Sequence, residues 1–331
     1  MIRVCIAGNS GHAATVTRAL PRLPQVEIAG WCRTWEGEPM TEVLEDFKKL
    51  GLHPAEYPDY RTMVGAARPD VLVVDGQFGD HEEMTVWALG QGLHVYCDKP
   101  LALSLDGLER VRAAAGAAPG LLWAMQTARY DPWFYTARRL IEAGAVGEIR
   151  LLSAQKSYRL GTRAAFFRDR ARQGGLIPWV AIHGIDFVRF LCPLPVEAVF
   201  ARHSAVGNGG YGDLEATAQL MLALRGGVSA QVSADYLRPA HAPTHGDDRV
   251  RVVGTAGVLE VRDDKVWLTN RTHDGLAPEP LLEVPGIFED FIHTLEGGGL
   301  GLLDAAESFE DSRLALLARD AADAGTLLQI R

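Results

Sequence analysis

The first thirty residues constrain the fold most, because they join a short apolar run, a turn of small residues and a helical pattern. Residues 2–7 are mostly apolar, residues 8–13 read Gly-Asn-Ser-Gly-His-Ala, and residues 14–20 have a helical pattern. A second apolar run follows at residues 26–31. A buried strand that feeds such a turn aims the free N–H groups of the next helix at a phosphate. The pattern therefore predicts a strand, a phosphate-binding turn and a helix.

The turn also approximates a dinucleotide-binding fingerprint, which has Gly first, Gly two residues later, and Gly or Ala three residues after that. Gly8 and Ala13 match the first and last positions, whereas Ser10 departs from the middle one and is followed directly by Gly11. We expect the backbone here to remain approachable. The predicted cofactor-binding residues of the turn are Gly8, Asn9, Ser10, Gly11 and His12.

Composition excludes several classes of protein. The 331 residues carry a formal net charge of −9, which argues against nucleic acid as a partner, because phosphate neutralisation needs a basic face. We expect no apolar run to be long enough to span a bilayer, and the N-terminus lacks the layout of a signal peptide. The four cysteines are widely spaced, which favours buried thiols in a reducing compartment. We therefore expect a cytoplasmic protein with no membrane partner.

The order of elements predicts two domains. Up to residue 127, apolar runs alternate with helical patterns, which is typical of a Rossmann-type parallel sheet. Residues 128–331 add helices and a series of alternating runs, which predict an α+β domain with a large, open, mostly antiparallel sheet. We expect residues 1–127 to bind NAD(P) and residues 128–331 to bind substrate and to form oligomers. The ligand is expected in the crevice between them, outside the carboxyl ends of the parallel strands.

Three separated stretches, taken together, resemble the Gfo/Idh/MocA oxidoreductases, which include glucose–fructose oxidoreductase and inositol dehydrogenase. The first is the turn at residues 8–13. The second, Asp98-Lys99-Pro100, is similar to the family's Glu-Lys-Pro motif, with Asp replacing Glu. The third runs from a Gly-Gly pair at 174–175 to His-Gly-Ile-Asp at 183–186. The resemblance implies NAD- or NADP-dependent hydride transfer to or from a sugar, cyclitol or related hydroxy compound, by a homodimer or homotetramer.

Lys99 and His183 are the predicted catalytic residues. Lys99 follows a strand of the parallel sheet, where its ammonium group can stabilise charge that develops on a substrate oxygen. The resemblance implies that Lys99 touches the cofactor as well as the substrate. The alternative is a solvated surface lysine. His183 can act as the general base for the alcohol proton, although a histidine in an apolar helix is often only a satisfied core residue.

The neighbourhood of His183 departs from the family. The family often has Asp four residues before this histidine, where this chain has Trp179, and tryptophan cannot take part in proton transfer. Either His183 acts with Lys99 alone, or the chemistry differs or is weak, or the ring forms an apolar wall against a sugar or nicotinamide. Trp179, Asp186 and Arg129 are the predicted substrate-binding residues. The rival function is a non-catalytic NAD(P)-binding sensor or regulator.

The choice between NADP and NAD depends on the end of the second strand. NAD enzymes carry an acidic residue there, whereas this chain has Arg33, which favours the 2′-phosphate of NADP by its charge. Alternatively, Arg33 stacks on the adenine. Gln77, His81 and Asp98 complete the predicted cofactor set. We expect no metal site, because the stretch containing His241 and His245 is rich in Pro and not helical.

Overall fold

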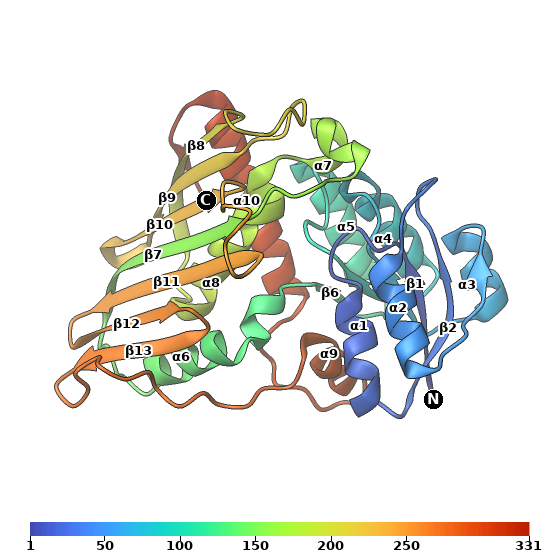
Figure 1. The fold of residues 1–331 in the computed structure, drawn as a ribbon, viewed down its shortest axis with the longest axis horizontal. Helices are drawn as coiled ribbons and strands as arrows, with labels where there is room; N and C mark the ends of the chain where they lie inside the picture. Colours follow the sequence, from blue (N-terminus) through green and yellow to red (C-terminus); the bar gives the residue numbers. More distant parts are fainter. Residues whose placement is uncertain (331) are drawn as a thin grey trace. The chain divides into compact units, whose positions relative to one another are not determined.

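The computed structural model describes residues 1–330, which divide into two compact units. The first unit comprises Met1–Gln126, Ala171–Gln173 and Pro285–Ser312, and the second comprises Thr127–Arg170, Gly174–Val284 and the C-terminal segment from Arg313. A parallel sheet lies in the first unit and a mostly antiparallel sheet in the second (Figure 1), so the predicted fold class is confirmed.

The sheet of the first unit has the strand order β3-β2-β1-β4-β5-β6, and every pairing is parallel. This is the order of a dinucleotide-binding Rossmann sheet. Its strands are β1 (Ile2–Ala7), β2 (Val26–Cys32), β3 (Glu56–Tyr57), β4 (Val71–Val74), β5 (His94–Cys97) and β6 (Leu122–Ala124). Its helices are α1 (Ala14–Ala19), α2 (Thr41–Leu50), α3 (Tyr60–Ala67), α4 (His81–Gly90), α5 (Leu105–Ala117) and α9 (Ile287–Leu295).

Continuous apolar sequence explains the central strands of this sheet. All four residues of β4 are fully buried, as is expected of a parallel strand that is covered on both faces. Two of these helices begin at a side-chain cap: Asp59 accepts from the Thr62 N–H at α3, and Ser104 accepts from the Gly107 N–H at α5. The short strand β3 was not predicted.

The segment Pro285–Ser312 belongs to the first unit, although the sequence placed all residues after 127 in the second domain. The physical reason is aromatic packing from helix α9 onto the parallel sheet. The rings of Phe288 and Phe291 each lie 5.2 Å from the ring of Tyr96 on β5, and Phe291 lies 5.5 Å from Trp123 on β6. Burying these large rings favours the return of the chain to the first sheet.

The sheet of the second unit has the order β13-β12-β11-β7-β10-β9-β8-β14, in which only the central β10–β7 pair is parallel. Its strands are β7 (Ile149–Tyr158), β8 (Val196–Ser204), β9 (Thr217–Leu224), β10 (Val228–Asp235), β11 (Gly246–Gly254), β12 (Gly257–Arg262), β13 (Lys265–Asn270) and β14 (Leu328–Gln329). Helices α6 (Pro132–Glu142) and α8 (Ile182–Leu191) pack against this sheet (Figure 1). The remaining helices after residue 127 are α7 (Arg170–Gln173) and α10 (Ala305–Ala324).

The alternation of buried and exposed residues distinguishes the two faces of the second sheet. Along β9 and β10, buried apolar residues alternate with more exposed residues, so one face forms the core and the other is open. Helix α8 lies very close to β10: a Cβ atom on Gly184 would stand 2.4 Å from Cγ1 of Val232. Glycine at this position therefore allows the helix that carries His183 to approach the sheet.

Two features concern the surroundings in which the protein is expected to work: the state of its cysteines and the burial of one long apolar stretch. All four cysteines are buried and free of disulfides, and burial raises the pKa values of the Cys5 and Cys32 thiols to about 12. Contrary to expectation, the stretch Arg170–Leu191 is long and apolar enough to cross a membrane. However, 94% of its most apolar window is buried inside the protein, as in the core helix of a soluble protein.

Candidate active site

In the first unit, the carboxyl ends of four neighbouring parallel strands place functional side chains along one edge of the sheet. The turn at Gly8 follows β1, Arg33 follows β2, Asp75 follows β4, and Asp98 follows β5. In doubly wound sheets, ligands bind at this edge. The sequence correctly predicted the strands that bring these residues together, but it gave no role to Asp75.

Two glycines bring the turn after β1 into close contact with the neighbouring strand ends. Gly8 has a φ of +90°, and a Cβ atom there would lie 2.4 Å from the carbonyl oxygen of Asp75. A Cβ atom on Gly11 would lie 1.7 Å from Oδ2 of Asp98. Only glycine fits at either position. This cradle suits a dinucleotide, whose phosphates need a backbone that can be closely approached.

Beneath the turn, two buried carboxyl groups lie side by side. Burial and the nearby charge of Asp98 raise the pKa of Asp75 well above its usual value. Burial opposes ionisation of Asp98 too, but the charges of His12 and Lys99 outweigh it and hold its pKa at about 2. Of the two groups, Asp75 therefore binds a proton more readily, and Asp98 more readily carries the charge.

These carboxyl groups hold the turn through hydrogen bonds. Oδ2 of Asp75 accepts the backbone N–H of Ala13 at 2.6 Å, and Oδ1 of Asp98 lies 2.8 Å from Nδ1 of His12. Asp98 is thus fully buried beneath the fingerprint turn. We infer that it shapes the cofactor site through His12 and through the turn rather than from the surface.

Lys99 lies at the same edge of the parallel sheet, directly after Asp98. Its side chain is only 1% exposed, so the alternative of a solvated surface lysine is wrong. Its backbone N–H donates to Oδ1 of Asp98 at 2.9 Å, and the Lys99–Pro100 peptide bond is cis. The ammonium group of a lysine in such surroundings is a pre-positioned donor for an oxygen that gains negative charge.

His81 and Gln77, both predicted to bind cofactor, have protein partners. The ring of His81 is fully buried, with Nδ1 at 2.9 Å from the carbonyl oxygen of Pro100 and Nε2 at 3.2 Å from that of Gly76. His81 therefore ties the turn after β4 to the segment after Lys99, which favours a positioning role. Oε1 of Gln77 accepts from Nη1 of Arg172 at 3.2 Å.

The end of β2 has an arrangement that the fingerprint did not predict. Nε of Arg33 donates to the backbone carbonyl of Glu38 at 3.0 Å, its Nη1 pairs with Glu56, and its guanidinium lies 5.1 Å over the ring of Trp31. Glu38 is itself 1% exposed and bonds to the turn after β1 through Asn9 and Ser10. The sequence missed Glu38, because two acidic residues stand in this loop and nothing in the pattern distinguishes them.

In the second unit, two of the predicted substrate-binding residues form a buried ion pair. Nε of Arg129 lies 2.6 Å from Oδ1 of Asp186, and its guanidinium lies 5.4 Å over the ring of Phe190. Both charged side chains are almost fully buried. The structure thus brings Arg129 and Asp186 together and gives the pair a role in holding helix α8.

His183 and Trp179 lie on either side of a change in helix geometry. Residues Ile177–Ala181 form a π-helical turn, and α8 continues from Ile182, so His183 is the second residue of α8. The sequence predicted only that His183 lies in an apolar helix. A π-helical turn holds an extra residue, and such turns occur frequently at functional sites. Because of it, Trp179 does not stand one regular turn before His183.

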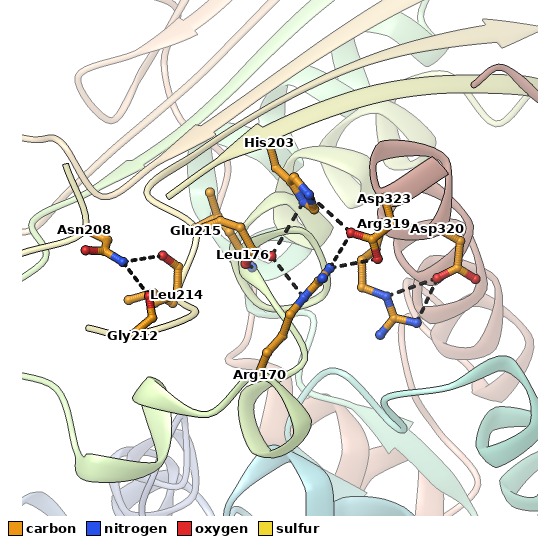
Figure 2. A network of polar contacts seen from close by, with 10 residues as sticks. All are labelled: Arg170, Leu176, His203, Asn208, Gly212, Leu214, Glu215, Arg319, Asp320 and Asp323. Carbon is orange, nitrogen blue, oxygen red and sulfur yellow. Dashed lines mark hydrogen bonds and ion pairs between the residues drawn. The ribbon is translucent and has the colours of Figure 1, made fainter. Parts of the chain in front are cut away.

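The chain that enters this turn is anchored by a network of charges (Figure 2). Glu215 accepts the backbone N–H of Leu176 at 2.9 Å and pairs with Nε of Arg170 at 3.0 Å. Arg170 also pairs with Asp323 of α10 at 2.8 Å, and Nε2 of His203 lies 3.2 Å from the same carboxylate. The network fixes the Gly-Gly segment that leads to His183. None of these four residues was singled out from the sequence.

A second polar cluster lies at the ends of β7 and β11. Nζ of Lys156 lies 2.5 Å from Oδ2 of Asp248, and the ring of Tyr158 stacks on His245 at 5.0 Å. Asp131 is also close to these charges, and burial is the main cause that raises its pKa to about 7. Within residues 1–330, no group of three or more His, Cys, Asp or Glu side chains is arranged to hold a metal ion.

Comparison with known proteins gives one family match in the N-terminal part of the chain and a second one after it. Residues 2–125 match the oxidoreductase family with an NAD-binding Rossmann fold, and residues 134–260 match the GFO/IDH/MocA C-terminal domain. A solved structure from Thermotoga maritima that is assigned to the oxidoreductases is 36% identical, with a TM-score of 0.95. The superposition covers 99% of this chain and 100% of that one.

Two relatives match over less of their length. The uncharacterized oxidoreductase YrbE of Bacillus subtilis is 28% identical over 62% of this chain and 59% of its own length. The myo-inositol 2-dehydrogenase of Thermotoga maritima is 27% identical over 69% of this chain and 67% of its own. The two family matches together cover most of the sequence, and the chain belongs to the Gfo/Idh/MocA family of NAD-binding oxidoreductases.

Proposed function

We propose that this chain is an NAD(P)-dependent dehydrogenase or reductase that acts on a CH–OH group of a cyclitol, sugar or related hydroxy compound. Family membership supports the redox chemistry and the cofactor class. The substrate class rests on the likeness to a relative named myo-inositol 2-dehydrogenase. The observation that carries the proposal is the burial of Lys99 beside the glycine turn, at the edge where a nicotinamide cofactor binds.

Lys99 is assigned to the substrate oxygen. The bound cofactor supplies the hydride acceptor or donor, and the chain must manage the charge and the proton. The ammonium group donates a hydrogen bond to the hydroxyl and stabilises negative charge that develops on its oxygen. Burial makes this interaction stronger than it would be in water, because little solvent competes for the ammonium group.

His183 is assigned to the proton. In the direction of oxidation, its neutral imidazole accepts the hydroxyl proton as the C–H bond breaks, and it returns the proton in the opposite direction. The proposal therefore places His183 and Lys99 on the same substrate oxygen. Trp179 takes the place of the acidic residue that often precedes this histidine, so His183 acts without that carboxylate. The ring of Trp179 then serves as an apolar wall of the substrate site.

The test of this function is turnover across a panel of cyclitols, hexoses and anhydrosugars, with nicotinamide absorbance as the readout. We expect turnover of at least one member and a loss of about a hundredfold or more in Lys99→Met, with nucleotide binding retained. Lys48→Met, on the exposed face of α2, is the control and should leave the rate unchanged. Nucleotide binding without turnover of any panel member would instead identify a sensor.

The open face of the second sheet is proposed to pair with another copy of the chain, which gives a homodimer or homotetramer. On this face, β7 exposes Leu151 and β9 exposes Met221. Such a face is a common self-association surface. Light scattering should report a dimer or tetramer, and Met221→Arg should shift the protein towards monomer. The same molecule is proposed to be cytoplasmic, in keeping with its buried free thiols.

A further inference from the structure

Four positively charged side chains lie around His245, where β7 ends and β11 begins. Partial burial lowers the pKa of the His245 imidazole, and four nearby cations lower it further: Arg163, Arg159, Lys156 and Arg238. Two of these cations have a carboxylate partner. Nζ of Lys156 lies 2.5 Å from Oδ2 of Asp248, and Nη1 of Arg238 lies 3.0 Å from Oδ2 of Asp247. The unbalanced positive charge therefore belongs to the other two arginines.

Arg159 and Arg163 pair with no carboxylate in the part of the chain that the structure describes. Nη2 of Arg163 donates to the carbonyl oxygen of Arg159 at 3.1 Å, and Nη2 of Arg159 donates to that of Ala242. Both Nε atoms are buried without a partner, whereas the Nη1 atoms lack a hydrogen bond but are not sealed from solvent. Each side chain is only partly exposed. Two like charges that share little water disfavour each other, and a bound anion relieves this cost.

Aromatic rings hold the guanidinium of Arg163 in place. It lies 4.8 Å from the centre of the Tyr236 ring and 5.5 Å from that of Phe167. The backbone N–H of Arg163 also donates to the hydroxyl of Tyr211 at 2.8 Å. A planar guanidinium that stacks on rings loses little further freedom when it binds an oxyanion. Arg163 is thus a restrained donor whose charge no protein group balances.

The arginine pair lies next to a residue assigned to the substrate. The ring of Phe167 meets that of Trp179 edge to face, with the centroids 6.5 Å apart. Because Phe167 also contacts Arg163, the three side chains form a continuous row. Trp179 belongs to the π-helical turn that leads to His183. The geometry therefore brings the unbalanced charge close to the proposed apolar wall of the substrate site.

We propose that Arg163 and Arg159 bind an oxyanion group of the substrate, so that the protein acts on an acidic sugar or cyclitol that carries a carboxylate or a phosphate; this rests on the proposed function. A guanidinium donates N–H bonds to the oxygens of either group in a fixed, fork-like geometry. A neutral sugar offers only hydroxyls, which leave the two positive charges unbalanced. Acidic compounds are therefore bound in preference to neutral ones of the same shape.

The experiment compares matched neutral and acidic compounds on the unaltered protein, by turnover with NAD or NADH and by calorimetric titration. Glucose is compared with glucuronate and with glucose 6-phosphate, which carry a carboxylate and a phosphate at the same carbon. In the same way, myo-inositol is compared with myo-inositol 1-phosphate. We expect kcat/KM and affinity to be about tenfold or more higher for at least one acidic compound than for its neutral parent. The glucuronate and phosphate arms distinguish the two kinds of oxyanion.

Substitution of Arg163 tests its part in this preference. Arg163→Gln should lower kcat/KM for the preferred acidic compound by about tenfold or more, mainly through KM, and change that of the neutral parent by less than about threefold. Arg163→Lys keeps the charge but not the fork, so it should lose less. Arg271→Gln, at an exposed position in the hairpin after β13, is the matched control and should behave like the unaltered protein.

The assignment is overturned if every neutral parent is bound at least as tightly as its acidic counterparts, or if Arg163→Gln weakens acidic and neutral compounds equally. If Arg163→Gln does not fold, the comparison on the unaltered protein decides alone. Preferred binding of an acidic compound without any turnover refutes the proposed function and retains the arginine site. Turnover of neutral compounds alone refutes the arginine site and retains the proposed function.

Discussion

Nε of Arg129 lies 2.6 Å from Oδ1 of Asp186, and both side chains are buried in the second unit. The pair joins the segment before α6 to helix α8, three residues beyond His183. Removing one member of a buried ion pair leaves the other charge in a poorly solvated place. The second unit is therefore expected to need the intact Arg129–Asp186 pair for its stability. Asp186 lies only three residues from the predicted catalytic residue His183.

We expect Arg129→Met to lower the free energy of unfolding by about 3–5 kcal/mol, because Asp186 loses its guanidinium partner while staying buried. The double variant Arg129→Met/Asp186→Leu should be less destabilised than the single variant, since no lone charge remains. Urea denaturation of the single and double variants measures both effects. Equal destabilisation of the two variants would show that charge pairing is not the cause.

Gly11→Ala tests the close approach of the fingerprint turn to Asp98. The added Cβ atom would lie 1.7 Å from Oδ2 of Asp98, so the turn must shift, at an expected cost of about 1–3 kcal/mol. We expect affinity for NADH to fall by about tenfold or more, since the turn no longer holds the phosphates in place. Titration with NADH and thermal unfolding measure the two effects.

The matched control is Gly65→Ala in helix α3, where an added Cβ atom meets nothing within 4 Å. This variant should keep its affinity for NADH and gain up to about 1 kcal/mol of stability, because alanine favours helix more than glycine does. Loss of NADH binding in the control as well would mean that the effect of Gly11→Ala is not specific to the turn.

Gly184→Ala tests the packing that positions His183. The new methyl group would lie 2.4 Å from Cγ1 of Val232, so α8 must move away from β10. We expect a loss of about 1–3 kcal/mol in stability and a fall in kcat with a smaller change in KM. Adding Val232→Ala makes room for the methyl group and should restore part of both quantities. Failure of the second substitution to rescue either quantity contradicts this account of the contact.

Asp131→Asn tests the raised pKa of a buried carboxyl group. The native pKa of about 7 exceeds the usual value of 3.8, so the native state binds this proton more tightly than the unfolded state does. The contribution of Asp131 to stability is therefore fully present below about pH 4, falls as the pH rises to about 7, and stays lost above it. The total loss is at most about 4 kcal/mol, and partial solvent access reduces it.

The asparagine variant should consequently be more stable than the unaltered protein at pH 8, by about 1–3 kcal/mol, and similar to it at pH 4 to 5. Unfolding by urea at a series of pH values gives both curves. Asp213→Asn, at an exposed loop position, serves as the control. A stability difference between Asp131→Asn and the unaltered protein that does not depend on pH would rule out titration of Asp131 as its source.

Strong local patterns made much of the fold predictable. The continuous apolar runs that became β1, β4 and β5 were recognisable because a parallel strand is buried on both faces. In contrast, β3 and β14 are two residues long, and no periodicity can develop over that length. The packing of α9 in the first unit could not be predicted either. Its sequence shows an aromatic face, but the pattern does not indicate which of the two sheets that face packs against.

The residues of the candidate site also fall into a group that the sequence predicted and a group that it did not. Gly8, Gly11 and Lys99 could be found because turn chemistry and strand ends have local signatures. Glu38 and Asp75 could not, since their importance comes from hydrogen bonds to residues that lie far away in the chain. The π-helical turn before His183 was equally invisible, because its sequence also satisfies the pattern of an ordinary buried helix.

By itself, the sequence determined the two classes of sheet, the glycine turn and the cofactor class, because each depends on a periodicity or spacing within a short stretch. Tertiary structure alone decided which carboxylate is hydrogen-bonded to the glycine turn, which of two neighbouring carboxyl groups binds a proton more readily, and which charges are buried as pairs. The physical reason is that charge and protonation depend on desolvation and on neighbours distant in the chain, and no local pattern encodes either.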